Sequence, residues 1–230
     1  MLCSTSYGIY NYTGTANITG GEVIAKATGS SIYGIYNENS NNMSISGTTI
    51  NVQDGNGIYN KGGILQIESS DITASKGIYN YTTNNTGAVI VKSANITATT
   101  YGIYNNYGST EIQSVNVKSN NYGVYNADSG NIIIGIKDGK INKDIPNIKG
   151  KEYGIYQLPT ASGKIYYYDG TIIGKMAIYG GISEIEQNSE IIIEQDTENN
   201  EKATLREIET QYVAKIGENK YTNLMSAIND

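Results

Sequence analysis

The sequence predicts an all-β chain that folds as a right-handed parallel β-helix of about eight coils, and three observations support this fold class. The string Tyr-Gly-Ile-Tyr-Asn, or a close relative of it, recurs eight times. Shorter apolar segments lie between its copies and are separated by Gly, Asn, Ser and Thr. The 230 residues include 27 Gly and 21 Tyr but no His, Trp or Phe. A repeat of this length is typical of a solenoid, in which each unit stacks on its neighbours.

The repeated string fixes the position of one strand in every coil. Its copies lie at residues 7–11, 33–37, 57–60, 77–80, 101–105, 122–126, 153–157 and 177–180. Equivalent positions are 20 to 31 residues apart. This spacing indicates a short coil of about 20 residues that tolerates insertions in its loops.

Two further apolar positions in each repeat predict the other two strands of a coil. In five repeats they are five residues apart, and in the next two they are seven apart. The pairs are Ile18/Val23, Ile45/Ile50, Ile67/Ile72, Val91/Ile96, Ile112/Val117, Ile134/Ile141 and Ile165/Ile172. Three strands per coil that stack on their equivalents form three parallel sheets, about 4.8 Å from coil to coil. Parallel crossovers are almost always right-handed, which gives the expected hand.

Alternation along the repeated strand predicts which side chains face the core. With Ile inward, the interior stacks Ile9, Ile35, Ile58, Ile78, Ile103, Val124, Ile155 and Ile178. The Asn that ends each string then forms an amide ladder at a bend, because Asn tolerates corner conformations. The opposite facing would bury Tyr beside Gly.

The tyrosines of the repeated strand then form a column on one outer face. They are Tyr10, Tyr36, Tyr59, Tyr79, Tyr104, Tyr125, Tyr156 and Tyr179. One interpretation is structural: stacked rings cover the sheet and support each other. The other is functional: a flat aromatic strip binds sugar rings or a partner surface. These eight residues are the candidate ligand-binding residues.

The pattern changes toward the C-terminus. Ile182–Glu186 and Glu190–Glu194 read as the last strands and the exit of the β-helix, which we place at residues 1–195. Residues 196–211 are expected to be an acidic linker or extended segment. Residues 212–230 are expected to begin a following module, with a strand at 212–217, a turn, and a helix from Asn223 to Asn229.

Three segments resemble parts of very large surface proteins of low-GC Gram-positive bacteria. They are the Tyr-Gly-Ile-Tyr-Asn repeats, the stretch Tyr166–Lys175 and the closing stretch Val213–Ile228. Those proteins carry pectin-lyase-like β-helix modules in tandem, and the closing stretch resembles the start of the next module. The resemblance implies export and an extracellular or cell-surface location. The chain shows no signal peptide or anchor of its own.

Composition argues against several classes of function. The chain has no His to act as a general base, and its only Arg, Arg206, lies outside the repeats. Acidic residues in the first 130 positions fall at different phases of the repeat, so adjacent coils do not pair them.

A single Cys3 gives neither an internal disulfide nor a Cys-based zinc site. The net charge of −6 does not suit nucleic-acid binding, and no apolar stretch suits membrane insertion. We therefore expect no catalytic residues, no metal and no cofactor.

The sequence thus favours a non-catalytic structural or adhesive segment of a bacterial cell-surface protein. It would act as a spacer and offer a side surface to surface glycans or to host or cell-surface proteins. Two alternatives stay open: a fragment of a polysaccharide lyase or hydrolase whose catalytic coils lie elsewhere, and the shaft of a phage tail spike.

Overall fold

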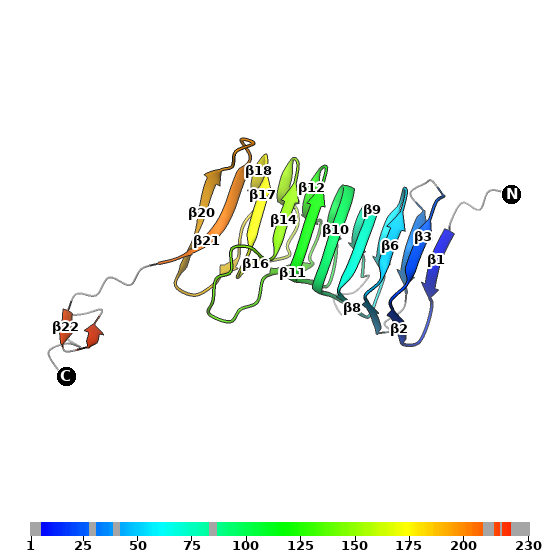
Figure 1. Ribbon diagram of the computed structural model, residues 1–230, viewed down its shortest axis with the longest axis horizontal. Coiled ribbons are helices and arrows are strands. Elements are labelled where there is room, and N and C mark those ends of the chain that lie inside the picture. The colour runs from blue at the N-terminus through cyan, green and yellow to red at the C-terminus, as the bar shows by residue number, and fades with distance from the viewer. Residues whose placement is uncertain are drawn as a thin grey trace.

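The repeats stack into an elongated solenoid made only of strands and turns, as Figure 1 shows for the computed structural model of the chain. The structure describes residues 6–27, 31–38, 42–82, 87–208, 214–216 and 218–221. Within these residues there is no helix. The predicted all-β class and the stacked parallel coils are confirmed.

Three parallel sheets run along the solenoid, and the first carries the repeated string; we call it the tyrosine sheet. Each of its strands pairs in parallel, in register, with the equivalent strand of the next coil. Its strands are β1 (Ser6–Asn11), β4 (Ile32–Asn37), β7 (Asn56–Asn60), the ends of β9 (Ser70–Asn80) and β10 (Ala88–Asn105), β12 (Tyr122–Asn126), β15 (Tyr153–Gln157) and β18 (Met176–Tyr179).

The second and third sheets hold the two other strands of each coil. The second sheet contains β2 (Ala16–Thr19), β5 (Met43–Ser46), β8 (Ile64–Glu68), the starts of β10 and β11 (Ser109–Ser119), β13 (Asn131–Ile134), β16 (Ile165–Tyr167) and β19 (Glu184–Ile185). The third contains β3 (Glu22–Ala25), β6 (Thr49–Val52), the start of β9, the middle of β10, the end of β11, β14 (Asn147–Gly150) and β17 (Thr171–Gly174).

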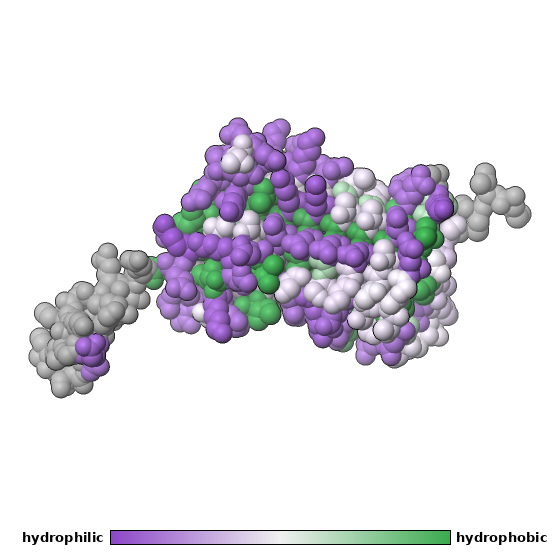
Figure 2. Space-filling model, in the orientation of Figure 1, coloured by the Kyte–Doolittle hydropathy of each residue, from purple (hydrophilic) through white to green (hydrophobic). Residues whose placement is uncertain are grey.

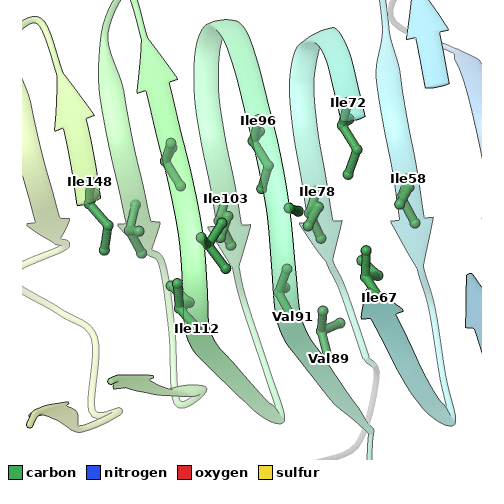
Figure 3. Packing of buried hydrophobic residues seen from close by; sticks show 14 of the residues in the cluster. Ile58, Ile67, Ile72, Ile78, Val89, Val91, Ile96, Ile103, Ile112 and Ile148 are labelled. Carbon is green, nitrogen blue, oxygen red and sulfur yellow. The ribbon is translucent and has the colours of Figure 1, made fainter. Parts of the chain in front are cut away.

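The core is a stack of β-branched side chains from all three sheets, and the predicted inward facing of the repeated Ile is confirmed. Ile58, Ile78 and Ile103 are completely buried, and Figure 3 shows them beside Ile67, Ile72 and their equivalents from the other two sheets. At the two ends, Ile9 and Ile178 are only partly buried but still pack against the core. The hydrophobic effect therefore acts along the whole stack, because each coil covers the apolar face of the next.

The glycine of the repeated string is required by close packing. A Cβ atom added to Gly102 would lie 2.2 Å from Cγ1 of Val117 and 2.5 Å from the carbonyl oxygen of Gly123 in the next coil. Both distances are far below van der Waals contact. The same crowding recurs at Gly34, Gly57 and Gly77. The last copy of the string has Ala177 at this position.

One apolar pair was assigned wrongly from the sequence. The predicted partner of Ile134 in the third sheet was Ile141, but Ile141 lies in a loop between β13 and β14 and is only partly buried. Ile148, in β14, occupies the inward position and pairs with Val117. The loop between Ile134 and Asn147 accounts for the longest spacing between repeats, because it inserts residues without adding a strand.

The solenoid has seven complete coils rather than eight. Its eighth coil contributes β18 and β19 to two sheets, but the third sheet continues with an antiparallel hairpin. In this hairpin β20 (Ser189–Gln195) pairs with β21 (Glu201–Glu207), and β21 pairs with β17. The segment expected at Glu190–Glu194 as a last strand and exit of the β-helix is thus present, and it leaves the stack as one strand of this hairpin.

The hairpin covers the C-terminal end of the core. Ala203 and Leu205 of β21 are completely buried. The hydroxyl of Tyr167 donates to the carbonyl oxygens of Gly170, at 2.7 Å, and Ala203, at 3.2 Å. A carboxylate oxygen of Glu201 accepts a hydrogen bond of 3.0 Å from the backbone N–H of Ala177, in the last strand of the tyrosine sheet. The hairpin therefore acts as a cap, which solenoids need to end their stack.

Much of the segment expected as an acidic linker or extended segment is extended, and it belongs to this cap. Residues 201–207 of the expected linker at 196–211 form β21, and residues 196–200 form the hairpin turn. Farther along, β22 (Ala214–Ile216) and β23 (Asn219–Tyr221) pair as a separate antiparallel sheet. The helix expected from Asn223 to Asn229 lies outside the described residues.

Candidate contact surface on the tyrosine sheet

The eight predicted tyrosines do form one column on the outer face of the tyrosine sheet. Each pairs in register with the next, from Tyr10 in β1 to Tyr179 in β18. From Tyr36 onward the rings stack nearly parallel, with centroids 4.2 to 5.2 Å apart. The tightest contact joins Tyr79 and Tyr104, at 4.2 Å and an interplanar angle of 8°. Offset stacking of this kind stabilises aromatic pairs beyond the area that they bury.

A second tyrosine column, which the sequence interpretation missed, flanks the first. The opening Tyr of the repeated string supplies it, at Tyr7, Tyr33, Tyr101, Tyr122 and Tyr153. Asn56, Lys76 and Met176 occupy the equivalent positions in the other coils. Tyr101 and Tyr122 meet the first column edge to face, for example at 81° between Tyr101 and Tyr104. The signal was present in the sequence, since these tyrosines precede the Gly at a constant spacing.

Exposure along the first column is uneven. Tyr10 and Tyr179, at its ends, are 45% and 37% exposed, whereas Tyr36 is only 9% exposed. The tyrosines between Tyr36 and Tyr179 are half-buried. Because their rings stack on each other, the ring faces are covered and the edges point outward. Sugar stacking on flat ring faces is thus limited to the ends of the column, and the middle offers ring edges and hydroxyls.

Burial changes the acid–base behaviour of these phenols. Desolvation raises the pKa of Tyr125 to about 12, and it also raises the pKa of Tyr59 and Tyr79. Desolvation acts in this direction because it disfavours the phenolate. At neutral pH these three phenols therefore stay protonated and keep a hydroxyl hydrogen that can be donated.

Tyr10, Glu38 and Lys61 form a small hydrogen-bonded network at the N-terminal end of the column. Glu38 accepts hydrogen bonds from the Tyr10 hydroxyl and from Lys61 Nζ, the latter at 2.6 Å. The Lys61 contact, followed by the Tyr10 contact, lowers the pKa of the Glu38 carboxyl. In the middle of the sheet, Lys76 Nζ lies 5.1 Å from the centroid of the Tyr79 ring, in the range of a cation–π contact.

The predicted asparagine ladder lies at the edge of the same sheet and fixes its register. The Nδ2 of Asn37 donates to Oδ1 of Asn60 at 2.9 Å, and the pattern repeats from Asn11 to Asn126 at 2.8 to 3.2 Å. The ladder stops at Gln157, the residue in register with Asn126. There Asn126 Nδ2 and Gln157 Oε1 are buried without a hydrogen-bond partner. The ladder holds the string rigidly and thereby positions the tyrosines.

No metal-binding cluster accompanies this surface among the described residues. They hold no group of three or more Asp, Glu or Cys side chains arranged to bind a metal ion. Asp71 is paired with an amide, Asn95 Nδ2, at 2.8 Å. Arg206 pairs with Glu190 at 2.6 Å in the terminal hairpin. The part of the chain that is described also contains no helix with the length and apolar character needed to cross a membrane.

Comparison with known proteins adds no relative. No family model matches the chain, and no match was found among the curated proteins or among the solved structures.

Proposed function

We propose that the chain is a non-catalytic structural and adhesive segment of a bacterial cell-surface protein. The observation that carries this proposal is the pair of tyrosine columns, which run coil after coil along one outer face of a rigid stack. Half-buried tyrosines with outward edges suit contact with a partner, because Tyr combines an apolar body with a polar tip. The extracellular location rests on the resemblance of the repeats to bacterial surface proteins.

As a spacer, the solenoid has the appropriate construction. Each coil contacts only its neighbours, and every coil adds about 4.8 Å of length. The hydrogen-bonded asparagine ladder and the stacked tyrosines both run parallel to the long axis. These continuous ladders resist bending between coils and would hold a contact surface in a fixed orientation.

Its partners would be surface glycans or host or cell-surface proteins. Because the ring faces in the middle of the column are covered, we expect the contact there to depend on hydroxyls and ring edges. A glycan would accept hydrogen bonds from the phenols, and a protein could do so through backbone carbonyls.

The test is binding of the purified chain to a glycan array and to immobilised extracellular-matrix and surface proteins. A Tyr59→Phe/Tyr79→Phe/Tyr104→Phe variant keeps the stacked rings but removes three hydroxyls, and a Tyr59→Ser/Tyr79→Ser/Tyr104→Ser variant removes the rings as well. Tyr166→Phe, on the second sheet, is the matched control. We expect the Phe variant to lose most of the binding and the control to keep it.

Two results would contradict the proposal. If the intact chain binds none of the probes, or if folded Ser and Phe variants bind as the intact chain does, the columns are only structural cover. The non-catalytic part is tested separately on pectin, alginate and glycosaminoglycans, with and without Ca²⁺. We expect no turnover, and measurable cleavage of any polymer would favour a polysaccharide lyase or hydrolase.

A further inference from the structure

A second surface, with lysine and amide side chains in its walls, lies on the third sheet, away from the tyrosine columns. Two adjoining hollows of about 490 Å³ and 310 Å³ open there and share Lys118 and Lys149 in their walls. Figure 2 shows hydrophilic side chains gathered over these C-terminal coils and the hairpin. We call the combined surface the lysine groove. It is lined by Asn95, Thr97, Asn116, Asn147, Lys118, Lys149, Lys151, Glu198 and Asn200, among others.

The stacking of coils brings three lysines together. Lys118 in β11 and Lys149 in β14 are direct partners on adjacent coils, although 31 positions separate them in the sequence. Lys151 lies beside the same coil, because its backbone N–H donates to the carbonyl oxygen of Ser119 at 3.0 Å. Like charges that face each other across neighbouring strands destabilise a sheet. An anion bound between these lysines would relieve that repulsion.

Among the described residues, only the Glu198 carboxylate lies at ion-pair distance from these lysines. Lys149 Nζ lies 2.9 Å from a carboxylate oxygen of Glu198, in the turn of the terminal hairpin. Within the described residues, Lys118 and Lys151 make no ion pair. The Glu198 side chain is 67% exposed, so releasing it from Lys149 costs little.

The turn that carries Glu198 is itself well ordered. The Oδ1 atom of Asp196 accepts hydrogen bonds from the backbone N–H groups of Glu198, at 2.9 Å, and Asn200, at 2.8 Å. These hydrogen bonds, first that of Asn200, lower the pKa of the Asp196 carboxyl. The turn therefore holds Glu198 at the mouth of the groove, where its carboxylate occupies the position of an anion.

The other half of the groove is neutral and rich in amides. Asn116 Nδ2 donates to Oδ1 of Asn95 at 3.1 Å, and Asn147 follows Asn116 in register on the next coil. Thr97 lies on the same outer face, in register with Lys118. An exposed row of amides and a hydroxyl can exchange hydrogen bonds with a ligand that carries many hydroxyl groups.

We propose that the lysine groove binds a sulfate or phosphate ester carried on a carbohydrate, and that Glu198 occupies the anion position in the free protein. The ester group would sit among Lys118, Lys149 and Lys151, because all three line one hollow and ammonium groups suit an oxyanion with several acceptor oxygens. The sugar would lie along Asn95, Asn116 and Asn147. Nucleic acid is a poorer occupant, because no aromatic side chain on which a base could stack is among the described residues that line the two hollows.

The test uses isothermal titration calorimetry on the intact chain at low and at physiological ionic strength. The probes are a sulfated oligosaccharide, a phosphorylated oligosaccharide, the same sugar without esters, inorganic phosphate and a single-stranded oligonucleotide. We expect at least one of the two ester-bearing sugars to bind best, and this binding to weaken as salt rises. The two ester arms then identify which ester the groove prefers.

Variants distinguish the groove from a general charge effect. Lys118→Gln/Lys149→Gln/Lys151→Gln should weaken ester binding by about tenfold or more, which corresponds to about 1.4 kcal/mol. Lys26→Gln/Lys92→Gln/Lys164→Gln removes the same charge from positions that do not line the groove and should change the affinity less than about twofold, because screened distant charges contribute little. Glu198→Gln should tighten binding several-fold, since it removes the competing carboxylate.

The proposal would be overturned if the intact chain bound neither ester, or if it bound the unmodified sugar, inorganic phosphate or the oligonucleotide better than both esters. An equal loss of affinity in the two triple-lysine variants would also contradict it. So would unchanged affinity in a folded Glu198→Gln variant. Because the groove and the tyrosine columns lie on different sheets, each set of variants can fail without affecting the other.

Discussion

The glycine in the repeated string is the most constrained single residue of a coil. At Gly102 the nearest obstacles to a Cβ atom are a carbonyl oxygen and a β-branched side chain, and neither can move without disturbing the next coil. We expect Gly102→Ala to destabilise the chain by about 1–3 kcal/mol, as overpacked cores do. Gly181→Ala is the control, because its Cβ atom would meet nothing within 4 Å. Thermal unfolding measures both, and equal stabilities would contradict the packing argument.

The two central residues of the string should respond very differently to mutation. Ile103 is completely buried, whereas Tyr104 is half-buried and faces outward. Ile103→Asp puts an unpaired charge into the apolar stack and should cost more than about 4 kcal/mol. Tyr104→Ser removes ring stacking with Tyr79 and Tyr125 but leaves the core filled, so its cost should be much smaller. Equal and severe losses in denaturant unfolding would show that the ring is part of the core.

The facing of these residues could be predicted because strand alternation leaves only two choices. The uneven exposure of the tyrosines could not, since it depends on the second column beside them. Tyr36 is packed against rings from three coils, including Tyr7, Tyr33 and Tyr59. A sequence shows that both tyrosines recur, but the angle between their rings is a property of the packed sheet.

At the scale of the element, the asparagine ladder lacks one hydrogen bond, between Asn126 and Gln157, and a substitution can restore it. Asn126 Nδ2 and Gln157 Oε1 are both buried and unpaired, because the longer Gln side chain bonds instead to the carbonyl oxygen of Gly163 at 2.8 Å. Gln157→Asn should let the residue accept from Asn126 and raise the free energy of unfolding by about 1 kcal/mol. Gln113→Asn, in β11 between its second-sheet and third-sheet parts and away from the ladder, is a control expected to give no gain. A loss of stability in Gln157→Asn would contradict the ladder account.

The hairpin and the long loop show where sequence patterns stop being informative. Glu190–Glu194 has the alternating pattern of a rung, yet β20 pairs antiparallel with β21 and caps the stack. Ile141 and Ile148 are equally apolar, and only the packed structure shows that Ile148 continues the third sheet. The lysine groove follows from this same assignment, because the loop length decides that Lys149 lies beside Lys118.

At the scale of the whole molecule, the tyrosine sheet should make the fold sensitive to alkaline pH. Burial raises the pKa of Tyr59, Tyr79 and Tyr125, the last to about 12, whereas the pKa of a tyrosine in an unfolded chain is about 10. Above pH 10 the unfolded chain therefore loses protons that the folded chain keeps. The contribution of these tyrosines to stability is complete below pH 10 and is lost as the pH rises toward the folded pKa.

This pH dependence can be measured by thermal unfolding between pH 8 and 12, together with phenolate absorbance. We expect the melting temperature to fall above pH 10 and the phenolate signal to appear late, along with unfolding. A Tyr59→Phe/Tyr79→Phe/Tyr125→Phe variant should show a shallower fall. Ionisation of every tyrosine near pH 10 with the fold intact would contradict the burial of the column.

The central claim is that each repeat forms one coil and that the coils stack in register. Spin labels on the outer face of the third sheet test this directly, with Cys3 replaced by Ser. Positions 24, 118, 149 and 173 lie on one line of register partners. Labels at 118, 149 and 173 lie four, five and six coils from a label at position 24.

Pulsed electron–electron double resonance on the three label pairs should give distances that rise by one equal step per coil. The expected separations are about 19, 24 and 29 Å, from a coil spacing of about 4.8 Å. They are small for residues between 94 and 149 positions apart in the sequence. Distances that fail to increase in equal steps, or that exceed these values severalfold, would contradict the stacked-coil account.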